Sequence, residues 1–482
     1  MAERLRPRDL ALLAEEAPSS PMHNATVEVF APGESGFDYQ ALVDLIGDRI
    51  AFVPRYRQRI VTVPGRLANP VWVDDPDFDL AYHVRRSALP RPGSHDQLRD
   101  LVARIISRPL DRHRPLWEVY LVEGLEGGRM ALLAKSHQIL VDGVETVDLG
   151  QVLLDTTAEP KSLIHDDWAP RRQPSTTALV MEALSDSASQ PVTVLQTLQG
   201  NLDSALRAVG DAAHSAGSTL NALANRRPTT DSPLTRPLSQ QRRFVSARTD
   251  LATYRAIRDA HGGTVNDVVL ATVTGALRGW LMTRAESLGG QKHLRAMVPM
   301  SVIDDELEAT SLGAQVAPHF VELPVGEPSP VVRLHQVSYA LRAHSQTDRA
   351  VSASRLAGIA GFAPTTFHAL GSRVAAAEQR RGFHLSVTNV PGPQFPLYAA
   401  GARMVETYPV PPLLPGHALS IGVTSYDGSV FYGITADRDA LPDADVLAQS
   451  VHEALDELSD AGTARPRAPR GRRGGSPRGK GR

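Results

Sequence analysis

The chain has 482 residues, 42% hydrophobic and 22% charged, which is the composition of an ordinary folded protein and not of a disordered one. It contains no cysteine, which excludes disulfides, thiol nucleophiles and cysteine-ligated zinc. No apolar run approaches the roughly 18 residues of a membrane-spanning helix, and the first residues lack the apolar core of a signal peptide. We therefore expect a cytosolic protein that does not span a membrane.

The net charge of −2 hides a strongly basic end of the chain. Residues 461–482 contain seven Arg and one Lys with no acidic residue, so removing this +8 leaves −10 on the rest. An acidic body argues against a protein that coats nucleic acid. The basic end combines Pro, Gly and Arg without apolar periodicity, and we expect residues 461–482 to form a disordered tail.

Strand and helix patterns alternate over residues 1–168, which predicts a first α/β lobe. Strand alternation occurs at 25–29, 117–121 and 130–137, and helical spacing at 40–50, 97–107 and 144–155. Residues 169–241 predict a helical linker, because Pro, Ser and Thr flank a middle part with apolar residues at helical spacing. That spacing favours packing on the body over binding a membrane surface, which remains the alternative.

Residues 242–460 predict a second lobe with a similar succession of elements. Its helices are expected at 252–260, 265–284, 330–345, 351–377 and 441–459, and its strands at 294–300, 315–323, 384–388, 418–424 and 429–435. The predicted fold class is therefore mixed α/β, with two comparable lobes joined by a long helical linker. We expect a ligand between the lobes, where pockets form preferentially.

The most informative segment surrounds the end of the strand at 130–137. His137 leaves this strand five residues before Asp142 and Gly143. An imidazole that removes a hydroxyl proton, followed by a carboxylate and a glycine that fix the loop, suits one kind of acyl-transfer site. By itself the spacing is a weak signal, since a single histidine at a strand end is more often structural.

Several further segments, taken together, give a more specific indication. The chain resembles the bacterial wax ester synthase/diacylglycerol acyltransferase family of the coenzyme A-dependent acyltransferase superfamily, over about residues 5–460. The matching segments, in family order, are Leu5–Leu13, Pro21–His23, Arg114–Trp117, Asp142-Gly143, Val265–Asp267, Val298–Ser301, Asn389–Pro393 and Gly422–Gly428.

This resemblance implies two chloramphenicol-acetyltransferase-like lobes with a tunnel between them. Acyl-CoA enters one side and a hydrophobic alcohol or diacylglycerol the other, with no further cofactor. The family motif is His-His-x-x-x-Asp-Gly, whose second His deprotonates the acceptor hydroxyl for direct attack on the thioester. The Asp holds the motif loop through a charged partner. The implied process is neutral-lipid synthesis at a membrane or lipid-droplet surface, by peripheral association.

Carried onto this sequence, the first motif His is His137, the Asp is Asp142 and the Gly is Gly143, but the second His is Gln138. A glutamine amide forms hydrogen bonds but cannot take a proton near pH 7. Three alternatives follow. His137 serves as the base; or Gln138 orients the acceptor and catalysis proceeds by proximity; or the chain binds acyl-CoA or lipid without transfer. An acyltransferase acting on another hydroxylated acceptor is a further possibility.

Four other residues are candidates for the site. Asn266 and Asp267 at a helix start either cap that helix or support the motif loop. By the resemblance Asn389 lies near the tunnel. Trp117 is a candidate substrate contact, with core packing beneath the motif strand as the competing interpretation. We find no His-Glu-x-x-His metal motif, no phosphate-binding loop and no Gly-x-Ser-x-Gly elbow, which disfavours metal, nucleotide and lipase chemistry.

Overall fold

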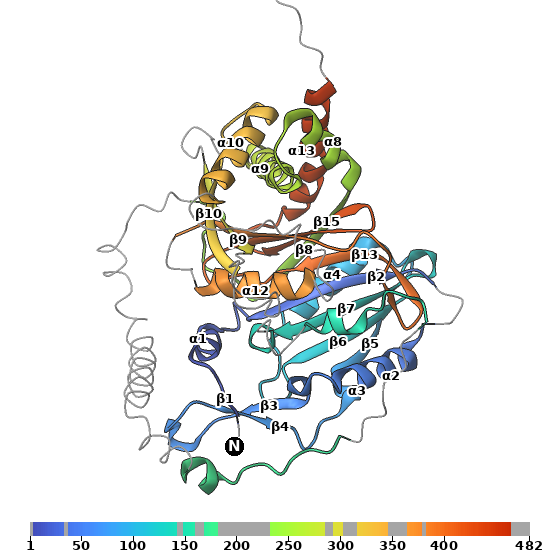
Figure 1. Ribbon diagram of the computed structural model, residues 1–482, viewed down its shortest axis with the longest axis vertical. Helices are drawn as coiled ribbons and strands as arrows, with labels where there is room; N and C mark the ends of the chain where they lie inside the picture. Colours follow the sequence, from blue (N-terminus) through green and yellow to red (C-terminus); the bar gives the residue numbers. More distant parts are fainter. Residues whose placement is uncertain are drawn as a thin grey trace, which may run out of the picture.

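Two six-stranded sheets, each with its own helices, form two lobes that lie one above the other in Figure 1. The computed structural model describes residues 3–32, 37–141, 148–159, 168–181, 232–284, 293–301, 316–345, 364–377 and 382–463. A three-stranded sheet lies beside the first lobe. The predicted mixed α/β class with two lobes is confirmed.

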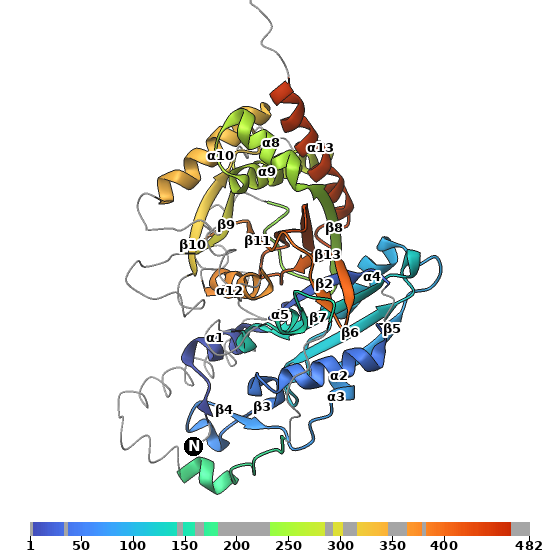
Figure 2. The same ribbon diagram turned by 45° about the vertical axis from the view of Figure 1, so that its right-hand side comes forward.

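The first lobe is built on the sheet order β12-β13-β2-β7-β6-β5. Its central strands pair antiparallel, with His23 of β2 opposite His137 of β7. Helices α2 and α3 lie on the side away from the second lobe, and α4 lies toward it (Figures 1 and 2). The bounds are β2 (His23–Phe30), α2 (Tyr39–Ile50), α3 (Leu80–His83), β5 (Val84–Ala88), α4 (His95–Ile106), β6 (Trp117–Glu123), β7 (Met130–His137) and α5 (Leu149–Leu153).

A smaller sheet of order β1-β4-β3 extends the first lobe at the N-terminal end. Leu179, in the described helical turn 176–181, packs on Val63 and Val71 of this region. Most of the helix predicted in the linker, and residues 182–231 as a whole, lie outside the described residues. The elements here are β1 (Glu3–Arg4), α1 (Pro7–Glu15), η1 (Pro54–Arg57), β3 (Gln58–Val61), η2 (Pro64–Arg66) and β4 (Val71–Asp74).

The second lobe has the sheet order β10-β9-β11-β14-β15-β8. Helices α8, α9, α10 and α13 cover its outer side, and α12 lies on its inner side, facing the first lobe (Figures 1 and 2). The bounds are β8 (Arg242–Asp250), α8 (Leu251–His261), α9 (Val265–Thr283), β9 (Leu294–Ser301), β10 (Val316–Leu323), α10 (Pro330–Ser345), α12 (Pro364–Ala377), β11 (Leu385–Pro391), β14 (Leu419–Tyr426), β15 (Ser429–Asp437) and α13 (Ala444–Thr463).

One hairpin crosses from the second lobe to the first. Strands β12 (Tyr398–Ala399) and β13 (Ala402–Val410) join the first sheet, where Val410 pairs with Ala25 of β2. Where β13 passes over β15, position 433 must be a glycine, because a Cβ at Gly433 would lie 1.7 Å from the carbonyl oxygen of Pro409. Tyr408 then packs edge-on against Phe431 at 5.3 Å. The sequence pattern does not predict this strand, which ties the two lobes together.

The C-terminal end differs slightly from the prediction. Helix α13 continues to Thr463, so the first three residues assigned to the basic tail form the last turn of a helix. Residues 464–482 lie outside the described residues, as do residues 351–363 of the helix predicted at 351–377.

Candidate active site

The motif strand β7 ends in a tight turn at the lobe interface. After His137 the chain forms the single 3-10 turn η4 (Gln138–Leu140), because His137 Nδ1 accepts a hydrogen bond from the Ile139 N–H at 3.2 Å. The Gln138 N–H donates to the carbonyl of Met22 at 3.0 Å. Asp142 and Gly143, the predicted end of the motif, lie outside the described residues.

The ring of His137 faces protein groups on both nitrogens. The side chain is 1% exposed, and Nε2 lies 3.5 Å from the carboxylate of Glu16. Burial of Glu16 opposes its ionisation, but the neighbouring His137 and Arg112 outweigh this and lower its pKa to about 2. Glu16 is therefore a carboxylate that attracts the Nε2 proton, while Nδ1 is used by the turn. His137 therefore holds the turn through Nδ1, with the Glu16 carboxylate beside its other ring nitrogen.

In the described part of the chain His137 Nε2 forms no hydrogen bond, and the Gln138 side chain forms none through either of its polar atoms. The Gln138 side chain is fully buried. Leaving a buried polar group unpaired costs about 1–3 kcal/mol, so such a group calls for a partner beyond the described residues. The amide oxygen can accept from a hydroxyl and the amide nitrogen can donate to an oxygen. Gln138 can thus orient an acceptor but cannot deprotonate it.

The main chain of this turn is held from the other lobe by Arg373 of α12. Its Nη1 donates to the carbonyls of Gln138 at 3.1 Å and Val141 at 2.8 Å, and its Nη2 donates to Asp9 of α1 at 2.5 Å. Sequence reasoning missed Arg373 and Asp9 as a pair. The sequence gives no signal for the role of Arg373. Two of its acceptors are main-chain carbonyls, and because every residue has a carbonyl, no residue type identifies these partners.

Buried side chains also fasten the motif strand to α4. Lys135 Nζ donates to the carbonyls of Ile105 at 3.2 Å and Arg108 at 2.6 Å, which satisfies the end of that helix. Burial lowers the pKa of Lys135 to about 8, although the nearby Glu118 carboxylate raises it. The cation therefore persists at pH 7. His23 Nε2 lies 2.9 Å from the Ile106 carbonyl. The end of α4 is therefore bound by one side chain from β2 and one from β7.

A small polar cavity of about 10 Å³ lies beside the motif strand, between β2 and α12. Within the described ranges both amide atoms of Asn24 and Nε2 of His368 lack a hydrogen-bond partner, while His368 Nδ1 contacts Thr388 Oγ1 at 2.7 Å. Burial lowers the pKa of His368 to about 3, so its ring is neutral. Asp148 accepts from Ser136, the residue before His137, at 3.3 Å. The volume suits about one water molecule, and the unpaired groups make this a polar site.

The structure brings two of the remaining predicted residues together. Asn389 of β11 donates through Nδ2 to Asn266 Oδ1 at the start of α9, at 2.8 Å. Asp267 has a different role, because it forms a capping box with Thr264 and accepts from Ser338 Oγ of α10 at 2.9 Å. The capping interpretation of Asp267 is therefore the one that the structure shows.

Trp117, a predicted substrate contact, lies in the core of the first lobe. It is fully buried, its Nε1 donates to the Tyr56 carbonyl at 2.7 Å, and His83 stacks on its ring at 4.6 Å. The indole N–H is therefore used by a hydrogen bond within the protein, and the ring face is covered by His83. The contribution of Trp117 to the site is to support β7, where it pairs with Ser136.

Two further findings concern the described ranges. No group of three or more His, Asp or Glu side chains there is arranged to hold a metal ion. Within the same residues, no helix is both long and apolar enough to cross a bilayer.

Two mixed α/β lobes with a histidine motif at their interface form the fold of condensation domains. The starter condensation domain of rhizomide synthetase shares this fold, with a TM-score of 0.52 at 13% identity, covering 96% of this chain and 94% of that one. The wax ester synthase/diacylglycerol acyltransferase from Marinobacter aquaeolei VT8 is more similar, with a TM-score of 0.66 at 28% identity, covering 96% of this chain and all of that one.

Sequence comparison gives the family. The wax ester synthase/diacylglycerol acyltransferase catalytic domain matches residues 5–269, and the C-terminal domain of that family matches residues 312–459. The chain belongs to this family, and the predicted resemblance is confirmed.

Two relatives from Mycobacterium tuberculosis are named as probable diacylglycerol O-acyltransferases. The first, tgs3, is 40% identical over 260 residues, which is 54% of this chain and 96% of that protein. The second, tgs1, is 32% identical over 423 residues, which is 87% of this chain and 88% of that protein.

Proposed function

We propose that this acyltransferase moves the acyl group of a long-chain acyl-CoA to the hydroxyl of diacylglycerol or a long-chain alcohol, giving triacylglycerol or a wax ester. The family match over both lobes and the names of the relatives support this. The observation that carries it within the chain is the buried amide of Gln138 at the lobe interface, which has no hydrogen-bond partner among the described residues. Acyl-CoA is the co-substrate, and the proposed reaction needs no other cofactor.

The chemistry is a direct displacement. The acceptor oxygen attacks the thioester carbonyl, the new ester C–O bond forms, the C–S bond breaks, and CoA leaves as a thiol with the hydroxyl proton. Gln138 would accept a hydrogen bond from the attacking hydroxyl and hold it in line. Without a base at this position the rate should lack the roughly 10²–10⁴-fold contribution of general base catalysis. Proximity at the lobe interface then supplies most of the acceleration.

A second candidate function follows from the same residue. A chain with Gln138 where a base is expected can bind acyl-CoA or lipid without transferring the acyl group. Release of free CoA by the pure protein separates the two functions. The test is a panel of diacylglycerol, a long-chain alcohol and a short-chain alcohol with one acyl-CoA. Release that depends on a hydrophobic acceptor supports transfer, whereas acyl-CoA binding without release supports the silent protein.

We also propose peripheral association with a membrane or lipid droplet, because acceptors of this class partition into lipid. Exposed apolar side chains near the three-stranded sheet support this, with Leu67 42% exposed and Met181 67% exposed. Flotation with liposomes tests it. The full protein should float, and a Leu67→Ser/Met181→Ser variant should float less. Recovery of the unchanged protein in the bottom fraction would contradict the proposal.

A further inference from the structure

A cavity of about 450 Å³ lies between the lobes, where α4 of the first lobe meets the start of β8 in the second. Its volume falls within the range of about 300–1,000 Å³ that is typical of small-molecule sites. It is distinct from the small cavity beside α12. The lining residues are Ala88, Leu89, Pro90, Gln97, Asp100, Ala103, Arg104, Gln241, Arg242, Arg243 and Arg438.

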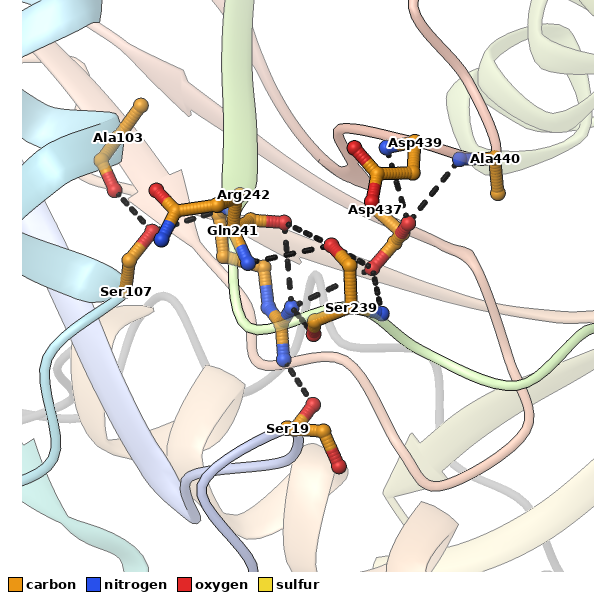
Figure 3. A network of polar contacts seen from close by, with 9 residues as sticks. All are labelled: Ser19, Ala103, Ser107, Ser239, Gln241, Arg242, Asp437, Asp439 and Ala440. Carbon is orange, nitrogen blue, oxygen red and sulfur yellow. Dashed lines mark hydrogen bonds and ion pairs between the residues drawn. The ribbon is translucent and has the colours of Figure 1, made fainter.

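The buried Arg242 fixes this side of the interface (Figure 3). It is 5% exposed, its Nη1 donates to the Ser239 carbonyl at 2.8 Å, and it lies 3.5 Å from Asp437 of β15. Its Nη2 donates to the carbonyl of Ser19, and its N–H donates to Ser107 Oγ at 2.9 Å, both in the first lobe. The cavity wall therefore belongs to both lobes and is held by hydrogen bonds.

The remaining charges around the cavity are mostly positive. Arg104 and Arg438 are exposed, and within the described ranges neither forms an ion pair. Arg243 is paired with Asp445, and Asp100 is the single acidic residue in the lining. The sequence outside the basic end carries a net charge of −10, so a basic cavity in this body creates a local field that attracts anions.

Two smaller cavities lie toward the motif strand and share lining residues with the basic cavity or with each other. The first shares Arg242 with the basic cavity and is also lined by His23, which pairs with His137. The second shares Val410 and Pro411 with the first and is lined by Asn24 and His368. Each has a volume of about 10 Å³. Shared lining residues thus extend stepwise from the basic cavity to the neighbourhood of the motif strand.

We propose that the basic cavity binds the phosphate groups of acyl-CoA, with Arg104 and Arg438 as the side chains that contact them. This rests on the proposed function, since it locates the donor substrate. The nucleotide of CoA carries a diphosphate and a 3′-phosphate, and guanidinium groups bind such oxyanions through paired, charge-assisted hydrogen bonds. The slender pantetheine arm would follow the smaller cavities toward the motif strand, which must widen to admit it.

Binding of CoA by the full-length protein tests this site. The variant Arg104→Gln/Arg438→Gln removes both unpaired charges, and Arg255→Gln on the outer helix α8 is the matched control, because Arg255 is exposed and does not line the cavity. Calorimetry with CoA, dephospho-CoA and adenosine 3′,5′-bisphosphate gives the affinities. We expect the Kd for CoA to rise about tenfold or more in the double variant, as charged hydrogen bonds are lost, and to stay unchanged in the control. An unchanged Kd in the double variant would overturn the proposal.

Phosphate groups also occur on lipid headgroups. Binding of the parent and the double variant to phosphatidylglycerol vesicles distinguishes a headgroup site from a CoA site. Loss of binding to phosphatidylglycerol vesicles, with an unchanged Kd for CoA, would overturn the proposal in favour of a headgroup site. The KM for acyl-CoA separates this inference from the proposed function. Acceptor-dependent CoA release with the same KM in parent and double variant would refute the site and keep the function. Weaker CoA binding by the double variant, in a parent that releases no CoA, would support the site and refute the function.

Discussion

Arg373 of α12 donates to the main-chain carbonyl of Gln138 across the lobe interface, over 3.1 Å between Nη1 and the oxygen. The residue that replaces the expected base is thus positioned by the second lobe, through its backbone. The same guanidinium binds Asp9 of α1, so one buried cation links the N-terminal helix, the motif turn and α12. The position of the Gln138 side chain therefore depends on the packing of the lobes.

Substitution of Arg373 by Met should destabilise the protein by about 3–5 kcal/mol, because it leaves Asp9 as a buried, unpaired carboxylate. Acyltransfer should fall with it, since the Gln138 and Val141 carbonyls lose their donor. The matched control is Arg403→Met, which breaks the exposed pair with Asp427 and should cost less than about 1 kcal/mol. Chemical denaturation gives both values. Equal losses in the two variants would contradict the account of this turn.

Substitution of Gln138 by His should raise kcat for acyltransfer by up to about 10²-fold, because it supplies a base beside the acceptor hydroxyl. His137→Ala should lower whatever activity the parent has, since Nδ1 holds the turn and Nε2 faces Glu16. His335→Ala, at an exposed position on α10, serves as the control for loss of an imidazole. CoA release over a range of pH gives the rates. Rates unaffected by either substitution, with acyl-CoA still bound, would remove the motif from the mechanism.

Glu28 on β2 should make the protein less stable as the pH rises. Burial, and next the Asp148 carboxylate, raise the pKa of Glu28 from 4.5 to about 8. Below pH 4.5 Glu28 is protonated in both the folded and the unfolded state, so it does not lower the free energy of unfolding there. Between this value and pH 8 only the folded state keeps the proton, and stability is progressively lost.

Glu28→Gln should therefore stabilise the protein by a few kcal/mol, on the order of 3, at pH 8 and hardly at all at pH 4.5. The exposed Glu126→Gln is the control and should show no such dependence. Denaturation at both pH values measures the difference. A gain in stability that is the same at both would show that Glu28 ionises normally in the folded protein.

Truncation after Thr463, the last residue of α13, should leave the Tm and the acceptor-dependent activity unchanged. The physical reason is compositional, because residues 464–482 contain Arg, Pro and Gly and no large apolar side chain that could dock on the body. Thermal unfolding and CoA release measure the two properties. If the shortened protein loses either of them, the tail must contribute contacts of its own.

The sequence predicts those parts of the fold that depend on local pattern. Alternating apolar residues locate β7 and its end at His137, and the helical pattern with Asn266 and Asp267 at its start locates α9. It does not predict β13, because that strand is stabilised by pairing with β2, far away in the chain. Gly433 of β15 makes room for the carbonyl of Pro409 on β13. The reason for a glycine at this position can be seen only when both strands are placed in the fold.

The candidate site shows the same limit. The motif identifies His137 and Gln138, but it does not tell which groups surround each of the two side chains. That depends on Glu16, which comes from another part of the chain to face His137, and on the absence of any partner for the Gln138 amide among the described residues. Arg373 and Asp9 could not be paired from sequence, since they meet only when α12 and α1 converge on the motif turn.

The central claim, that this chain transfers an acyl group with Gln138 in place of the base, is tested most directly by one measurement on the unmodified protein. Free CoA and the new ester are quantified together after incubation with a long-chain acyl-CoA, with and without diacylglycerol. We expect slow release of CoA that requires diacylglycerol and is matched by an equal amount of triacylglycerol. Acyl-CoA that binds but is not consumed when diacylglycerol or a long-chain alcohol is present would contradict it.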